Sequence, residues 1–304
     1  MEVAIRDAGL YQAGFPAAAA GLSELGVSHI EVAIDRDGVV RSLEGDERLD
    51  LTTQAGLDTL KAQLAGHQVS VCALLCAQDF NSNAGEPGPH LDWVVQAVRA
   101  ADALGARAVR IDSAMTGQAE LPLEERVRIF ADAVIEVLRR TPESEVGLGI
   151  ENHGRQGNDP EWMGGVIRRV GSPRLGLTLD VGNWYWYGHP LSRVYEIYRE
   201  LGPLVKATHV KNIAYPAEMR ETQRAIGYEY GRYVSPLDEG DLDMARVAAI
   251  LRECGYDGPL TIEDESLGKF PEAERPAVLK RDVAHLRTAI GSIREGAGRG
   301  PGGA

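Results

Sequence analysis

The chain has 304 residues, of which 44% are hydrophobic and 25% charged, and its formal net charge is −13. This composition is typical of a globular protein, and the length suits one large domain or two small ones. Nucleic-acid binding depends on a basic surface, so the acidic balance argues against such a partner. No apolar run reaches the roughly 18 residues that a membrane span needs, so we also expect no membrane partner.

The N-terminal stretch MEVAIRDAGLYQAGF has no basic region followed by an apolar core, so it does not resemble a signal peptide. The three cysteines, Cys72, Cys76 and Cys254, are too few for a disulfide framework. We therefore expect a cytoplasmic protein in which Cys72 and Cys76 are core thiols. A paired metal role for these two thiols is the alternative.

Short apolar runs alternate with helix-like stretches along the whole chain. The runs predict eight strands: Glu2–Arg6, His29–Ile34, Val69–Leu75, Ala106–Asp112, Val146–Glu151, Leu175–Asp180, Val205–Lys211 and Pro259–Glu263. Strands joined by helical crossovers form a parallel sheet, and eight such units predict a (β/α)₈ TIM barrel. An open doubly wound sheet is the rival, but no GxGxxG turn follows the first strand. We expect one barrel domain over residues 1–292 and a disordered, Gly-rich tail over 293–304.

Each of the last four predicted strands ends at a residue of the metal-binding type. These residues are Glu151, Asp180, His209 and Glu263, and their successive spacings are 29, 29 and 54 residues. Each step spans one strand-helix unit, the last one enlarged by a long polar loop. Because active residues of a barrel lie at the C-terminal ends of its strands, the four should lie at similar heights.

Side-chain alternation supports this arrangement, since successive residues of a strand face opposite ways. In the sixth strand the leucines at 175, 177 and 179 share the helix-facing side, which leaves Asp180 on the side of the barrel axis. The fifth and eighth strands repeat the pattern at Glu151 and Glu263. The seventh is ambiguous, because both alternating sets of its residues mix polar and apolar types.

Three converging carboxylates repel one another, so they must take up protons or be paired with cations. One divalent cation would resolve the repulsion. Oxygen-rich ligation with one imidazole suits Mn²⁺ first, with Mg²⁺, Co²⁺ or Zn²⁺ as alternatives. The competing interpretation is a structural ion-pair network in which Lys211 and Arg155 neutralise the acids.

The motifs IENHG, LDVGN, THVKN and EGDLD…LRECGYDGPLTIED resemble the sugar isomerase/epimerase superfamily with the xylose-isomerase-like barrel. The resemblance covers nearly the whole chain. It implies that Glu151, Asp180, His209 and Glu263 bind one divalent metal, and that the two glutamates are the catalytic acid/base pair. The choice of Glu263 over Asp264 and Glu265 rests on this resemblance. The family includes ketose 3-epimerases, hydroxypyruvate isomerase, inosose dehydratase and lyases of oxidised sugars.

One position departs from the family pattern. Many members carry His three residues after the metal-binding Asp, where this chain has Asn183. The DNA-repair endonucleases of the same fold use that His and several others to bind three zinc ions. With Asn183, seven His in total and a net charge of −13, the nuclease function is disfavoured. Asn183 can still hydrogen-bond a sugar hydroxyl.

Further residues are candidates for substrate binding, each with a structural alternative. His153 and Lys211 follow two ligands by two residues, and either could contact substrate or only pair with an acid or the backbone. Glu31 lies inside an apolar run and needs a polar partner. Trp184 could stack on a sugar or belong to the core. Tyr228 lies in the long loop 215–241, which could cover the site or form a subunit contact.

The first functional hypothesis is a metal-dependent isomerase or epimerase that acts on a keto sugar through a cis-enediolate, with Glu151 and Glu263 exchanging the proton. The alternative is a lyase or dehydratase that forms the same enolate from an oxidised sugar or glycoside and then expels a leaving group. A third possibility is an inert sugar-binding subunit. The expected partner is a small sugar or sugar derivative, and a homo-oligomer is possible.

Overall fold

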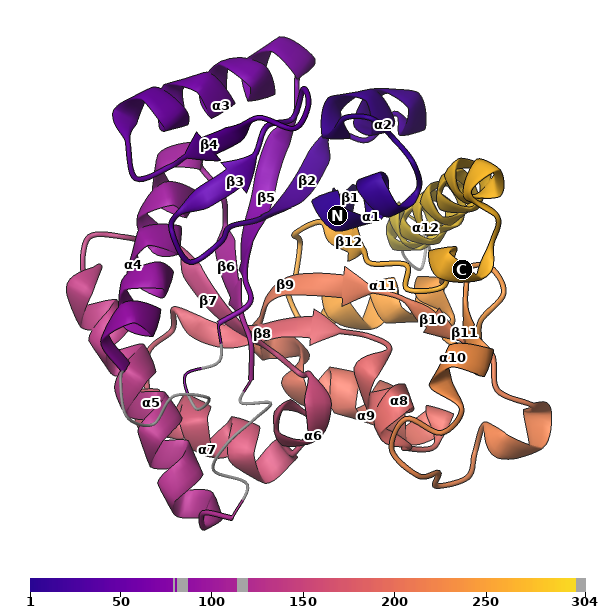
Figure 1. The fold of residues 1–304 in the computed structure, drawn as a ribbon. Coiled ribbons are helices and arrows are strands. Elements are labelled where there is room, and N and C mark those ends of the chain that lie inside the picture. Colours follow the sequence, from indigo (N-terminus) through magenta and orange to yellow (C-terminus); the bar gives the residue numbers. More distant parts are fainter. Residues whose placement is uncertain (79, 81–86, 114–119, 299–304) are drawn as a thin grey trace.

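The computed structural model describes residues 1–78, 80, 87–113 and 120–298. Within these residues, eight parallel strands form a closed barrel in the order β1-β2-β5-β6-β7-β8-β9-β12, and β12 pairs with β1 (Figure 1). The barrel strands are β1 (Val3–Arg6), β2 (His29–Ala33), β5 (Ser70–Cys76), β6 (Ala108–Ile111), β7 (Gly147–Glu151), β8 (Leu175–Asp180), β9 (Val205–Val210) and β12 (Leu260–Ile262). The predicted TIM barrel is confirmed.

Helices surround the barrel on its outer side (Figure 1). The helix-like stretches of the sequence correspond to α2 (Ala18–Leu25), α3 (Gln54–His67), α4 (Pro87–Leu104), α5 (Leu123–Arg140), α7 (Pro160–Val170), α9 (Leu191–Leu201), α11 (Met244–Glu253) and α12 (Arg275–Gly298). Short helices follow several strands: α1 (Asp7–Gln12), α6 (Gly154–Gly157), α8 (Asn183–Tyr187) and α10 (Tyr230–Tyr233). Two small antiparallel two-stranded sheets pair β3 (Val39–Arg41) with β4 (Arg48–Asp50) and β10 (Asn212–Ile213) with β11 (Val234–Ser235).

Local sequence explains where α7 begins and ends. The Asp159 side chain accepts hydrogen bonds from the backbone N–H groups of Glu161 and Trp162, and Pro160 occupies the first turn. Asp is a favoured N-cap, and Pro has no N–H that the first turn would leave unpaired. Gly171 ends the helix with φ 62°, a left-handed conformation that glycine adopts without steric strain.

The faces of the barrel strands are those that side-chain alternation predicts. Large apolar residues of β7 and β8, such as Leu148 and Leu177, are fully buried in the core between strands and helices. The barrel interior holds small residues instead, among them a separate cluster of Ala73, Ala108 and Ala207. The position of Ala207 settles the ambiguous seventh strand, because His209 shares its face.

A close approach of β7 and β8 lies beneath the strand ends. A Cβ atom at Gly149 would come within 2.8 Å of the Thr178 backbone nitrogen, so only glycine fits there. The Thr178 hydroxyl donates to the Gly149 carbonyl at 3.1 Å. This contact fixes the two strands that carry Glu151 and Asp180.

The C-terminal helix ends later than the predicted start of the tail. We expected disorder from residue 293, but α12 continues to Gly298. Ile293 explains the extension, because its partly buried side chain packs against the core and continues the apolar face of Ile290. The rest of the predicted tail, 299–304, lies outside the described residues.

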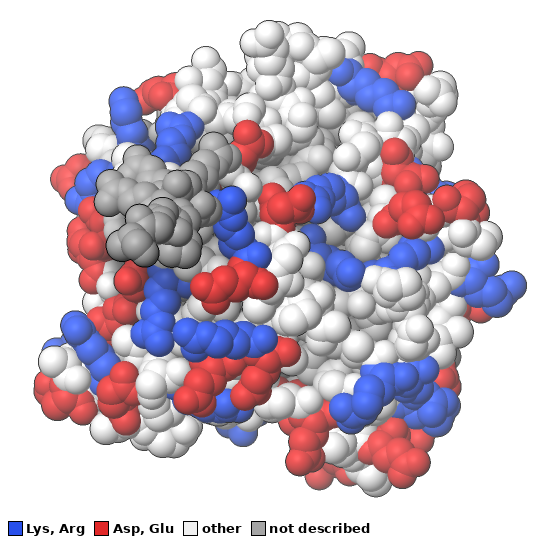
Figure 2. Space-filling view, turned by 180° about the vertical axis from the view of Figure 1, so that it is seen from behind, with Lys and Arg blue, Asp and Glu red and all other residues white. Residues whose placement is uncertain are grey.

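The structure also bears on surface charge, on membrane-spanning helices and on the cysteines. Figure 2 shows acidic and basic side chains interspersed over one face, in keeping with ion pairs such as Arg128 with Glu125. None of the described helices is both long and apolar enough to cross a membrane. Cys72 and Cys76 are buried free thiols, and Cys254 is partly exposed.

Candidate metal centre

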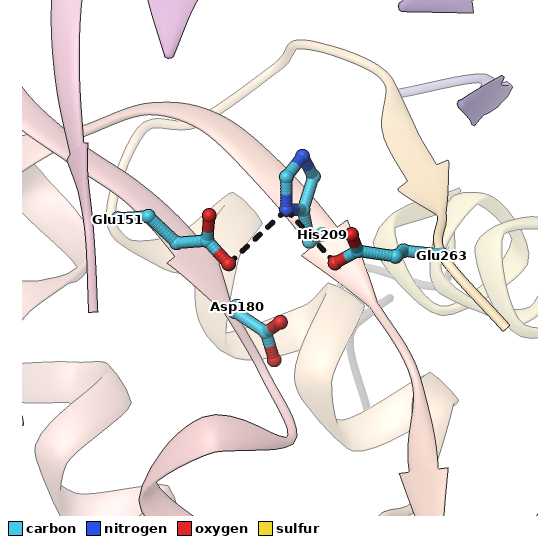
Figure 3. A group of neighbouring side chains, drawn as sticks. All are labelled: Glu151, Asp180, His209 and Glu263. Carbon is cyan, nitrogen blue, oxygen red and sulfur yellow. Dashed lines mark ion pairs between the residues drawn. The ribbon is translucent and has the colours of Figure 1, made fainter. Parts of the chain in front are cut away.

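Four polar side chains converge at the C-terminal end of the barrel. Glu151 ends β7, Asp180 ends β8, His209 lies one residue before the end of β9, and Glu263 directly follows β12. Each offers one ligand atom, and these atoms all lie within 4.8 Å of one another. Figure 3 shows the Glu151 and Glu263 carboxylates pointing toward each other, with the His209 ring between them. The structure thus brings together the four residues that the sequence analysis gave as candidate metal ligands.

The imidazole of His209 has two different sides. Its Nδ1 atom faces the centre, 3.1 Å from a Glu263 oxygen and 3.4 Å from a Glu151 oxygen. Its Nε2 atom faces away and hydrogen-bonds Glu31 at 2.7 Å. Burial alone would lower the pKa of His209, but Glu263, Glu31 and Glu151 together raise it well above its ordinary value. The surrounding carboxylates thus favour the charged form of the ring in the metal-free protein, whereas a metal at Nδ1 requires the neutral form.

Each carboxylate of the group also pairs with a cation. The pairs are Arg110 with Glu151, Lys211 with Asp180, and Arg6 with Glu263. Burial would raise the pKa of Glu151 and of Glu263, but the cations and His209 hold both below their usual range. Asp180 behaves differently, because its complete burial outweighs Lys211 and raises its pKa to about 7. Pairing with cations, one of the two expected responses to repulsion, is thus present at all three carboxylates.

Two of these cations are held in turn by a second acid. Arg110 donates to Asp112 at 3.1 Å, and Asp112 also contacts His153 at 3.2 Å. Lys211 donates to Glu265 at 2.6 Å, and the Tyr230 hydroxyl donates to the same carboxylate at 2.7 Å. These second contacts fix the cations and, through them, the ligand carboxylates.

The sequence analysis missed Arg6, Arg110 and Asp112, and it named Arg155 as a neutralising cation. Arg155 is exposed, and the structure gives it no ion pair among the described residues. A signal for Arg110 was present: a charged residue inside the apolar run of β6 must face a polar interior or pair with an acid. Side-chain alternation along β6 also predicts that Arg110 faces the barrel interior, because its neighbours Val109 and Ile111 are apolar.

The donor set fits a divalent cation. The Nδ1 atom of His209 and the Oδ2 atom of Asp180 are buried and lack a hydrogen bond of good geometry, although each lies within ion-pair distance of a charged group. Buried polar atoms of this kind are uncommon unless an ion or water completes them. Three carboxylates and one imidazole are ligands that suit Mn²⁺, Mg²⁺, Co²⁺ or Zn²⁺.

Asn183 and His153 lie beside the four ligands. Asn183 begins α8, and its backbone N–H donates to Asp180 at 3.1 Å. Its side-chain amide lies 3.5 Å from a Glu151 oxygen, at the limit of a hydrogen bond. The His153 side chain is 39% exposed, which leaves part of the ring accessible next to the centre. Both positions are compatible with the predicted contact to substrate.

For Glu31 the sequence left open a contact with substrate or a hydrogen bond to another site residue, and the structure shows the hydrogen bond. The Glu31 side chain is completely buried, and it bonds the side of His209 that faces away from the other ligands. Closure of the barrel brings β2 across from β9, and the local sequence pattern could not predict this proximity. The partner that this buried glutamate requires is therefore His209.

The structure places Trp184 in the core and Tyr228 against another tyrosine of the long loop, and the predicted substrate contact of Tyr228 stays a prediction. Trp184 is 1% exposed and belongs to the apolar core beside Tyr198, which corresponds to the structural alternative for this residue. Tyr228 stacks on Tyr233 within the long loop, with ring planes 13° apart. Two positions further on, Tyr230 is the loop tyrosine that reaches the centre, through Glu265.

The long loop between β9 and β12 is anchored on the aromatic residues after Asp180. The buried Arg224 donates to the carbonyls of Tyr185 and His189, and its guanidinium lies 4.4 Å from the Tyr185 ring centroid. The Tyr185 hydroxyl donates to Asp241 at 2.8 Å. These contacts explain much of the aromatic run at 184–187, which supports the loop that carries Tyr230.

A family profile described as the xylose isomerase-like TIM barrel matches residues 19–289. With the closed barrel and the four converging residues, this match shows that the chain belongs to the xylose isomerase-like TIM barrel family. The resemblance inferred from the sequence motifs is confirmed. No curated protein matches the chain in sequence.

Solved structures share the fold over most of the chain. An IolI protein with a bound zinc atom is 15% identical, with a TM-score of 0.69 over 96% of this chain and 99% of that one. A D-tagatose 3-epimerase-like protein is 16% identical, with a TM-score of 0.68 over 98% and 100%. The probable 3-DHS dehydratase AsbF from Bacillus anthracis is 13% identical, with a TM-score of 0.67 over 94% and 99%. At these identities the likeness establishes the shared fold.

Proposed function

We propose that the protein is a divalent-metal-dependent isomerase or epimerase of keto sugars, with Glu151 and Glu263 as the proton-transferring pair. The observation that carries the proposal is the convergence of three carboxylates and His209 within 4.8 Å at the catalytic end of the barrel. Mn²⁺ is the first candidate ion. An IolI structure of the same fold contains a bound zinc atom, which supports a metal-binding role for this chain.

A divalent ion at this centre would polarise the keto oxygen and the adjacent hydroxyl of a sugar. It would thereby acidify the C–H bond of the carbon that carries this hydroxyl. Glu151 and Glu263 are both held below their usual pKa by neighbouring cations, so each is in the ionised form that a general base and a metal ligand require. They approach the centre from opposite sides (Figure 3). One can therefore remove a proton while the other, once protonated, returns one to the opposite face or to the neighbouring carbon.

Neighbouring residues would bind and orient the sugar. The side-chain amide of Asn183 and the accessible ring of His153 are suited to sugar hydroxyls. Lys211 already pairs with Asp180 and Glu265, which favours a role in holding ligands over direct stabilisation of an enediolate. Tyr230 would delimit the site from the side of the long loop.

Solvent-deuterium exchange in the Mn²⁺-loaded enzyme tests the proposal on a panel of keto sugars and oxidised glycosides. Deuterium in the recovered or isomerised sugar supports proton transfer. Loss of a leaving group would support the lyase or dehydratase instead, and the absence of both reactions would support an inert sugar-binding subunit.

The Glu263→Gln variant tests the residue assignment. It keeps the side-chain size and one ligand oxygen but removes the basic carboxylate. Turnover of the metal-saturated variant should fall by roughly 10²–10⁴-fold, the usual contribution of general acid–base catalysis, with substrate binding retained. Glu253→Gln, on the exposed face of α11, is the matched control. Normal turnover in Glu263→Gln would exclude Glu263 and direct attention to Asp264 or Glu265.

A further inference from the structure

Glu31 and His209 form a buried pair that the proposed proton transfer does not use. They lie 178 positions apart in the sequence, on β2 and β9, and both side chains are completely buried. The Glu31 oxygen accepts a hydrogen bond from Nε2 at 2.7 Å. The His209 ring separates Glu31 from the centre of the site. Glu31 therefore has no contact with substrate and affects the site only by way of the imidazole.

The strand pairing fixes the position of Glu31. Its neighbours Ile30 and Val32 are buried in the core on the helix side, so Glu31 faces the barrel interior. The register between β2 and β5 shifts at this residue, because Ile30 pairs with Val71 while Glu31 pairs with Ala73. The extra residue at this shift is Cys72 of β5, so β2 keeps its regular alternation through Glu31 and directs this side chain toward His209.

The pairing determines which imidazole nitrogen is free. A neutral imidazole carries one proton, and an acceptor at Nε2 keeps the proton on that atom. The Nδ1 lone pair then points toward Glu151 and Glu263, where Nδ1 lacks a hydrogen bond of good geometry. The opposite tautomer would direct an N–H group into the ligand cluster and leave Glu31 facing a bare nitrogen.

We infer that Glu31 is a positioning residue that fixes the Nε2–H tautomer and the ring orientation of His209, so that Nδ1 can bind a divalent cation. This inference rests on the metal centre proposed above. A carboxylate behind a metal-bound imidazole also raises its basicity, and loss of such a partner typically weakens metal binding by 10–100-fold.

Isothermal titration of the purified protein with Mn²⁺ tests the inference. Glu31→Gln should weaken Mn²⁺ binding by about 10–100-fold. The control is Glu44→Gln, which breaks a carboxylate–imidazole pair of the same type on the surface, where Glu44 lies 3.0 Å from His67. Its affinity for Mn²⁺ should equal that of the wild type. Thermal unfolding of the metal-free variants identifies any general loss of folding.

A double-mutant cycle separates positioning from simple loss of negative charge. If Glu31 acts through His209, Glu31→Gln should have no further effect on Mn²⁺ affinity in a His209→Ala background, which is titrated at higher Mn²⁺ concentrations because the loss of one ligand weakens its binding. An equal loss in both backgrounds would overturn the inference in favour of long-range electrostatics. Failure of the wild type to bind Mn²⁺ would instead refute the metal centre, so the two failures are distinguishable.

Nitrogen-15 NMR of the histidine rings, with Zn²⁺ as a diamagnetic probe, gives a readout that does not depend on affinity. The His209 signals, identified by their absence in His209→Ala, should show a protonated Nε2 and a metal-shifted Nδ1. In Glu31→Gln the Nε2–H signal should broaden or lose its downfield shift. A protonated Nδ1 in the Zn²⁺-loaded wild type would overturn the assignment.

Discussion

The Asn152 side chain and the Asp180 main chain form two reciprocal hydrogen bonds. The Asn152 amide donates to the Asp180 carbonyl at 2.9 Å, and the Asp180 N–H donates to the Asn152 side-chain oxygen at 2.8 Å. Both residues are completely buried. Asn152 directly follows Glu151, so one side chain fixes the relative position of two proposed metal ligands.

Asn152→Ala should therefore destabilise the protein by about 2–4 kcal/mol, because it leaves two buried backbone groups without partners. Urea unfolding followed by circular dichroism measures the change. Glu24→Ala, at an exposed position of α2, should leave the stability within about 0.5 kcal/mol of the wild type. Unchanged stability in Asn152→Ala would mean that these hydrogen bonds are replaced by solvent.

Metal removal should lower the melting temperature without unfolding the protein at room temperature, since Arg6, Arg110 and Lys211 already pair with the ligand carboxylates. Saturation with Mn²⁺ at 100 times its dissociation constant should add about 2.7 kcal/mol of stability. Calorimetry with and without a chelator checks this prediction. His209→Ala should show little of the Mn²⁺-dependent shift, and a shift equal to that of the wild type would place the ion elsewhere.

Arg110→Gln should destabilise the metal-free protein by about 3–5 kcal/mol, because Glu151 and Asp112 would lose their buried cation. Added Mn²⁺ should restore more stability to this variant than to the wild type, since the ion would replace part of the missing positive charge. Denaturant unfolding with and without Mn²⁺ measures both effects. Arg139→Gln, which breaks an exposed pair on α5, is the control. Equal Mn²⁺ stabilisation of wild type and Arg110→Gln would contradict the prediction.

Stability should also fall as the pH rises through the neutral range, because of Asp282. Burial and the neighbouring Asp264 carboxylate raise the pKa of Asp282 to about 9, compared with 3.8 for a free side chain. The folded protein therefore retains a proton that the unfolded chain releases above pH 4. Between these values the unfolded state binds fewer protons, so this group lowers stability by up to about 1.4 kcal/mol per pH unit.

Asp282→Asn imitates the protonated state and should flatten this pH dependence. The Leu237 N–H, which donates to Asp282 at 2.7 Å, keeps an acceptor in the variant. Melting temperatures measured from pH 5 to pH 9 test the prediction. If the two proteins lose stability in parallel over this range, Asp282 is not the group responsible.

The order of strands and helices could be predicted from the sequence, because periodicity is a local property. Apolar runs alternate with amphipathic stretches, and each barrel strand lies within two residues of its predicted bounds. The positions of the candidate metal ligands at the strand ends could be predicted for the same reason, but the choice of Glu263 over Asp264 and Glu265 came from the family resemblance. Parallel strands of a barrel end at one edge, so four polar residues at successive strand ends had to lie close together.

Only the tertiary structure decided which cations and acids these four residues meet. The sequence showed that Glu31 needs a polar partner but not which one. Its contact with His209, 178 positions away, depends on how the barrel closes. Arg6 and Arg110 come from β1 and β6, and their choice of carboxylate depends on strand register and tilt. Side-chain alternation reports which face a residue occupies, but it contains no information about what lies across the barrel axis.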